Sequence, residues 1–149
     1  TSPDLKKLLQ IVDHCCIYIL IAGTYTPFAM VLSGGLLGPS LLAGVWVLAL
    51  TGIALKVMFG NRFPILTVTS YVMMGWIGVF AIQPMFEALG AAPVALAVAG
   101  GLAYTIGVIF FPWKSIRHHH AIFHVFVMAG SILHYVAVAV YVVPYAANL

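Results

Sequence analysis

The stretch LGPSLLAGVWVLALTGIALKVMF, residues 37–59, decides the fold class of this chain, and its single charged residue is Lys56. As a helix it is long enough to cross the hydrocarbon core of a bilayer, which is roughly 30 Å thick. Four further stretches have the same apolar character, and short segments rich in Gly, Pro, Asn or Ser separate them. We therefore predict an all-α polytopic transmembrane helix bundle that forms one domain over residues 1–149. Its five predicted spans lie at about residues 11–32, 37–59, 63–85, 91–112 and 120–145.

The composition excludes several classes of protein. Of the 149 residues, 64% are hydrophobic and only 6% are charged, whereas a soluble domain carries about 25% charged residues. A soluble enzyme and a disordered chain are therefore excluded. Six Lys and Arg residues with a net charge of +3 do not make a phosphate-binding surface for nucleic acid. We expect membrane lipids as the main partners and no nucleic acid, and the sequence indicates no particular oligomeric state.

The basic residues predict the orientation of the bundle. Because the spans alternate in direction, all six basic residues fall on the same side of the membrane. They are Lys6, Lys7, Lys56, Arg62, Lys114 and Arg117. The positive-inside rule assigns this side to the cytoplasm, so the N-terminal side and the basic loops are expected there.

Several ionisable residues fall within or at the ends of predicted spans, where such side chains are costly and point to function. Asp13 lies at the cytoplasmic start of the first span, and His120 and His124 lie at the cytoplasmic start of the fifth. The i, i+4 spacing of the two histidines places both imidazoles on one helix face, as a shared metal ion requires. Imidazole suits zinc, and a nearby carboxylate can orient a ligand or hold a water. His134 lies about 15 Å deeper along the same helix and on a different face.

Each of these residues also has a simpler interpretation, which the spacing leaves open. Two histidines four residues apart often form hydrogen bonds at a membrane interface without binding a metal. The macrodipole favours a carboxylate such as Asp13 near a helix N-terminus. His134 can form a hydrogen bond with a neighbouring helix.

Three blocks of sequence resemble the hemolysin III branch of the progestin and adipoQ receptor superfamily. They are DHCCIY (13–18) running into AGTYTPF (22–28), YVMMGW (71–76), and HAIFHVFV (120–127) with His134 beyond it. The resemblance implies a seven-span bundle in a bacterial inner (plasma) membrane, with a zinc ion near the cytoplasmic leaflet. In the family three histidines hold the ion, and an aspartate acts through a water. Asp13 matches that aspartate, His120 and His124 match the two last-span ligands, and His134 matches a histidine that is not a ligand.

The resemblance further implies that the five spans correspond to the third to seventh of the family. The first two spans, and with them the third histidine ligand, are expected upstream of this chain. His14 or a second molecule is the alternative source of that ligand. The implied activity is a zinc-dependent hydrolase of a lipid amide, such as a ceramide, with Asp13 as general base. The alternative is a non-enzymatic protein, either a pore-forming hemolysin or a receptor-like membrane protein.

Overall fold

The computed structural model describes residues 2–111, 113, 115 and 117–148, and within these ranges the chain is all-α with no strand. The elements are α1 (Pro3–Val31), α2 (Leu37–Phe59), α3 (Pro64–Trp76), the 3-10 helix η1 (Ile77–Ala81), α4 (Ile82–Leu89), α5 (Ala91–Phe110), α6 (His119–Ala137), the π-helix η2 (Val138–Val142) and α7 (Val143–Ala146). Consecutive elements join into five helical stretches that are long and apolar enough to cross a membrane. The predicted five-span helix bundle is confirmed.

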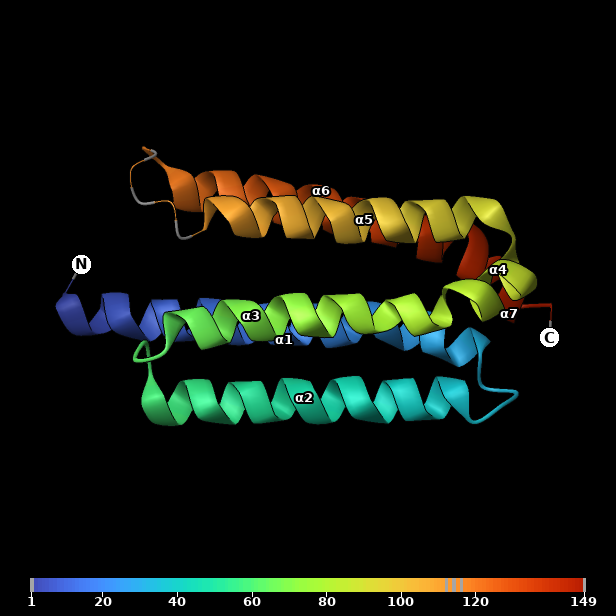
Figure 1. The fold of residues 1–149 in the computed structure, drawn as a ribbon, viewed down its shortest axis with the longest axis horizontal. Coiled ribbons are helices and arrows are strands. Elements are labelled where there is room, and N and C mark those ends of the chain that lie inside the picture. Colours follow the sequence, from blue (N-terminus) through green and yellow to red (C-terminus); the bar gives the residue numbers. More distant parts are fainter. Residues whose placement is uncertain (1, 112, 114, 116, 149) are drawn as a thin grey trace.

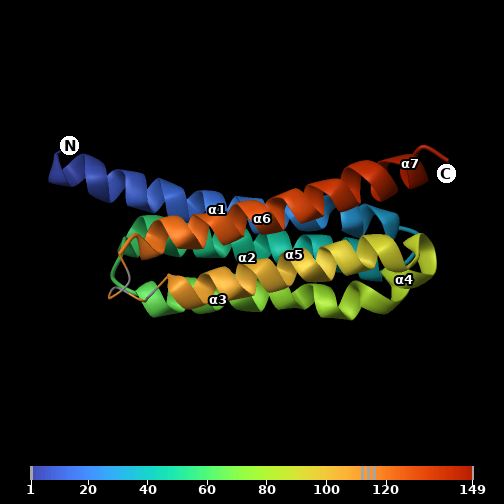
Figure 2. The same ribbon diagram turned by 90° about the horizontal axis from the view of Figure 1, so that it is seen from above.

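The first helix begins at Pro3, well before the predicted start of the span near residue 11. Ser2 caps it by accepting a hydrogen bond from the backbone N–H of Leu5, Pro3 occupies the first turn and Asp4 faces the positive end of the helix dipole. These are ordinary helix-start signals, but a search for apolar runs does not register them. As a result α1 extends beyond the rest of the bundle at its N-terminal end (Figure 2).

Two of the five stretches contain turns that are not α-helical. The third is α3, η1 and α4 in succession, and the fifth is α6, η2 and α7. Pro144 lies in the first turn of α7, directly beyond Val143 and the wide π turn of η2, and it lacks the N–H that a regular helix would use. The fifth stretch starts at His119, close to its predicted start at residue 120. The fourth ends at Phe110, and the predicted end at residue 112 lies outside the described residues.

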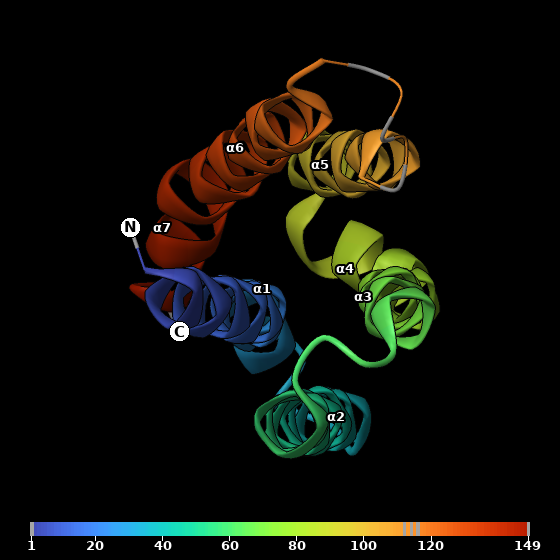
Figure 3. The same cartoon turned by 90° about the vertical axis from the view of Figure 1, so that its left-hand side faces the viewer.

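The long helices run side by side along one axis (Figure 1). Viewed from one end, α1, α3, α5 and α6 surround a common centre, and α2 packs outside them against α1 and α3 (Figure 3). Side chains from α1, α3, η1, α4, α5 and α6, with Leu41 of α2, line a partly open cavity of about 200 Å³. Its walls are almost entirely apolar, and its few polar groups include Thr24, Tyr104 and His134.

Small residues set the contact between α2 and α1. A Cβ at Gly52 would overlap the Tyr18 ring, and a Cβ at Gly38 would overlap backbone atoms of Ala29 and Leu32. Glycines of this kind allow two membrane helices to approach closely. Tyr18 in turn packs edge-on against Tyr71 of α3, with 4.6 Å between the ring centroids. This contact joins the outer helix α2 to the inner ring of helices.

The N-terminal end of α1, the C-terminal end of α2 and the N-terminal end of α6 lie at one end of the bundle (Figure 1). We call it the basic end, because every described Lys and Arg lies there. These residues are Lys6, Lys7, Lys56, Arg62 and Arg117. Lys114, which was predicted to lie with them, is outside the described residues.

Candidate metal centre

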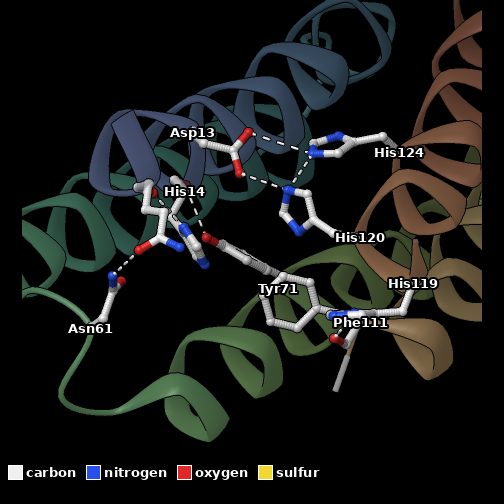
Figure 4. A network of polar contacts seen from close by, with 9 residues as sticks. Asp13, His14, Asn61, Tyr71, Phe111, His119, His120 and His124 are labelled. Carbon is white, nitrogen blue, oxygen red and sulfur yellow. Dashed lines mark hydrogen bonds and ion pairs between the residues drawn. The ribbon is translucent and has the colours of Figure 1, made fainter. Parts of the chain in front are cut away.

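Asp13 of α1 meets His120 and His124 of α6 at the basic end (Figure 4). One ligand atom from each residue lies within 4.8 Å of the other two. The two Nε2 atoms are 3.0 Å apart, and each is 3.7 Å from a carboxylate oxygen of Asp13. Two helices that are far apart in the sequence therefore bring together the three residues that the sequence singled out. No other group of three His, Cys, Asp or Glu side chains with this spacing occurs among the described residues.

We call Asp13, His120 and His124 the metal group. The geometry of these three side chains fits a shared ion. Zinc ligands lie about 2.0–2.2 Å from the ion, so two of them at a tetrahedral angle are roughly 3.3 Å apart. The Nε2–Nε2 distance of 3.0 Å is close to that value, and the 3.7 Å distances suit a carboxylate that binds the ion directly at a wider angle or through a water. The side chains of His120, His124 and Asp13 are 49%, 37% and 33% exposed. This leaves room for an ion and further ligands.

The remaining histidines lie outside the metal group. The Nδ1 atom of His14 lies 2.5 Å from the backbone oxygen of Gln10, and its ring packs edge-on against Phe111. Nδ1 of His119 lies 2.9 Å from the backbone oxygen of the same Phe111, near the end of α5. Because a carbonyl oxygen can only accept, both Nδ1 atoms donate. His14 is thus turned toward its own helix.

His134 lies deep in the bundle, where its Nε2 donates to the backbone oxygen of Ala97 at 3.0 Å. Its Nδ1 is buried and has no hydrogen-bond partner among the described residues. The imidazole packs against Gly100 of α5 and beside the Tyr104 ring. His134 therefore joins α6 to α5, as its simpler interpretation predicted, and lies apart from the metal group.

Two aromatic residues contact the helical turns that carry the candidate ligands. The sequence alone did not connect either of them with the site. The Tyr71 hydroxyl donates to the backbone oxygen of His14 at 2.9 Å, which ties α3 to the turn of α1 that carries Asp13. The Phe123 ring lies 6.2 Å from the His120 ring and 5.2 Å from the His124 ring. The only signal for Tyr71 in the sequence is its place in the YVMMGW block.

Three side chains that could hold a metal ion bridge the first and last described spans of an apolar helix bundle, so the chain is a polytopic membrane protein with a candidate metal centre. The comparisons with known proteins identify its family. The sequence model described as Haemolysin-III related matches residues 1–135, and the chain belongs to this family.

The relatives agree with this assignment. The chain is 44% identical over 142 residues to Hemolysin-3 of Bacillus cereus, covering 95% of this chain and 65% of the relative. It is 45% identical over 143 residues to the Hemolysin-3 homolog of Bacillus subtilis, covering 96% and 67%. The human Monocyte to macrophage differentiation factor is 28% identical over 141 residues, covering 89% and 58%. The chain thus spans about two thirds of the length of its bacterial relatives. No solved structure matches.

Proposed function

We propose that His120 and His124 bind zinc, that Asp13 acts beside the ion as the general base, and that the protein hydrolyses an amide bond in a membrane lipid. The observation that carries this proposal is the metal group itself, with donor atoms from two helices within 4.8 Å of one another. His120 and His124 each supply a neutral imidazole nitrogen, the donor type that zinc favours. A bound zinc ion acts as a Lewis acid, which polarises a carbonyl and acidifies water.

The chain's own residues supply the remaining chemistry of the proposed reaction. A carboxylate oxygen of Asp13 accepts the proton of the attacking water and returns it to the leaving amine, as a general base and then a general acid. The apolar cavity accommodates the lipid tail, because it begins close to the metal group. Tyr71 and Phe123 line the cavity and also contact the helical turns that carry Asp13 and the two histidines.

Zinc content of the purified chain in detergent is the first test. The wild type should hold close to one zinc per chain, and His120→Ala/His124→Ala should hold none. His118→Asn is the matched control, because it removes a neighbouring exposed imidazole and because Asn tolerates the left-handed backbone at this position (φ 64°). Zinc in the control but not in the double variant supports the site. An equal zinc content in the wild type, the double variant and the control, or no zinc in any of them, contradicts the proposed zinc site for this chain.

A second arm tests the expectation of an upstream third histidine. The same measurement is made on this chain joined to the part of the Bacillus subtilis relative that it does not match. Zinc in the joined form alone would place a further ligand in that segment. Absence of zinc from both forms would remove the hydrolase mechanism.

Turnover separates binding from catalysis. With a ceramide in mixed micelles, Asp13→Asn should keep its zinc and lose fatty-acid release, because its amide cannot accept the proton. His124→Ala should lose both zinc and fatty-acid release. A wild type that binds zinc but releases no fatty acid from any lipid amide would restrict the site to metal binding.

The names of the two Bacillus relatives favour a second candidate function, membrane lysis. We propose dye release from liposomes as its test. A lytic protein should release dye from wild type, from Asp13→Asn and from His124→Ala alike, because none of these changes alters the bundle interior. The almost entirely apolar lining of the cavity argues against a water-filled path through the bundle.

A further inference from the structure

Lys56 is the most buried charged side chain of the described residues. It lies in the last turn of α2 and is 4% exposed. It continues the α2 stripe of Val45, Ala49 and Gly52, whose Gly52 packs against Tyr18 of α1. Lys56 is therefore directed into the seam between α1 and α2.

No carboxylate of the described chain neutralises this ammonium. The protein has three acidic residues. Asp13 pairs with the two histidines of the metal group, and these are the only ion pairs among the described residues. Glu87 lies on α4, near the opposite end of the bundle, where it accepts a hydrogen bond from Gln83. Asp4 is exposed in the first turn of α1.

The ammonium nevertheless is not completely enclosed. Nζ of Lys56 forms no hydrogen bond with any described residue, yet the only fully enclosed polar side-chain atom without a partner in that part of the chain is His134 Nδ1. The stem of Lys56 is thus packed between helices while its charged tip keeps some accessible surface, as a lysine near the end of a membrane span is expected to do. The C-terminal dipole of α2 favours a cation here but does not neutralise it.

The same seam carries polar donors. Asn61, in the turn that follows α2, donates to the side-chain oxygen of Gln10 on α1 at 3.0 Å. The amide N–H groups of Gln10 form no hydrogen bond with a described residue. This end of the bundle therefore offers a buried cation and neutral donors close to where two apolar helices end. Basic pockets of this kind between membrane helices bind anionic headgroups, and lysine binds phosphate as a point charge.

We propose that Lys56 binds the phosphate group of an anionic ligand in the seam between α1 and α2 at the basic end. The site is separate from the metal group, because Asp13 faces α6 whereas Lys56 approaches α1 from α2. It therefore does not depend on zinc or on hydrolysis. The phosphate comes either from an anionic phospholipid or from a soluble phosphate compound, and the two sources differ in a binding experiment.

The test measures thermal unfolding of the detergent-purified chain during titration with phosphatidylglycerol, phosphatidylcholine or inorganic phosphate. A ligand that binds only the folded protein raises the unfolding temperature in proportion to its affinity. Phosphatidylglycerol should stabilise the wild type more than phosphatidylcholine does. Lys56→Met, which keeps the stem and removes the charge, should weaken phosphatidylglycerol binding about fivefold or more. Lys56→Arg should retain the preference.

Lys7→Met is the matched control, because it removes an exposed lysine from the same end of the protein. It should leave phosphatidylglycerol binding nearly unchanged. Stabilisation by inorganic phosphate that Lys56→Met abolishes would assign the site to a soluble phosphate. Two results would overturn the proposal. In the first, both lipids stabilise the wild type equally and inorganic phosphate does not stabilise it. In the second, Lys7→Met and Lys56→Met lose phosphatidylglycerol binding to the same extent. Should Lys56→Met fail to fold, Lys56→Gln takes its place as the variant that removes the charge, and the same loss of phosphatidylglycerol binding is expected.

Discussion

Replacing Gly52 by Ala tests whether the outer helix α2 holds the inner ring of helices in place. A Cβ at this position would overlap the Tyr18 ring and would lie 2.9 Å from its Cδ1 atom. The ring has little freedom to move, because Tyr18 is 3% exposed and its hydroxyl lies 2.6 Å from the Ser70 hydroxyl. It also packs edge-on against Tyr71. The added methyl group must therefore displace either the ring or the whole of α2.

The size of the effect follows from three contributions. Overpacking of a filled site costs about 1–3 kcal/mol. Loss of the Tyr18–Ser70 hydrogen bond adds about 0.5–1.5 kcal/mol, whereas removal of a glycine from a helix interior stabilises by about 1 kcal/mol. We expect Gly52→Ala to lower the free energy of unfolding by about 0.5–3.5 kcal/mol in total. Because Tyr18 packs on Tyr71, which holds the turn next to Asp13, metal affinity should fall as well.

Gly44→Ala is the control for this experiment. Gly44 lies on the same helix, is exposed, and has nothing within 4 Å of an added Cβ. It should be neutral or slightly stabilising. Both variants are unfolded by heat in the same detergent and followed by helical circular dichroism. Equal unfolding temperatures for the two variants would show that the α1–α2 contact tolerates a methyl group, and the packing argument would be wrong.

Three further outcomes are expected. Gly100→Ala should lower the unfolding temperature, because its Cβ would lie 2.8 Å from the His134 ring. Gly101→Ala is the control and should leave the unfolding temperature unchanged, because nothing lies within 4 Å of its added Cβ. Tyr71→Phe should lower the free energy of unfolding by about 0.5–1.5 kcal/mol through loss of the bond to the His14 carbonyl, and unchanged stability would show that this bond is not formed. Bound metal should be released on acidification, because protons compete for the imidazole nitrogens, and a metal content that is constant from neutral to mildly acidic pH would contradict histidine ligation.

Much of the architecture could be predicted because a bilayer leaves few alternatives. A chain of this composition can only span as helices, so the apolar runs gave the number of spans. The alternation of direction, together with the basic residues, predicts that Asp13 and His120 lie at one end of the bundle. The start of α1 was misplaced because Ser2 and Pro3 specify a helix through capping, which is independent of hydropathy.

The details of the site depend on how each helix is rotated about its own axis and on how its side chains pack. The number and order of the spans predict neither. His14 follows Asp13 directly, yet its imidazole is turned away to bond Gln10. Lys56 was interpreted as one of several interfacial cations, although its neighbours bury it. Both outcomes follow from which face of a helix meets which neighbour. In a span that is apolar all round, the pattern of the sequence does not mark that face.

The position of Tyr71 and Phe123, between the apolar cavity and the metal group, restricts which lipid the proposed hydrolase could cleave. Both residues are buried, both line the apolar cavity, and both contact the turns that carry the metal group. A lipid whose tail lies within the cavity therefore has the head-proximal end of that tail at Tyr71 and Phe123, directly beside Asp13 and the two histidines. The bond that reaches the metal group is then the one that joins tail to head. For this reason the proposed substrate is a lipid whose amide carbonyl belongs to the acyl chain, and an amide buried deep within a tail or remote in a headgroup would not reach the site.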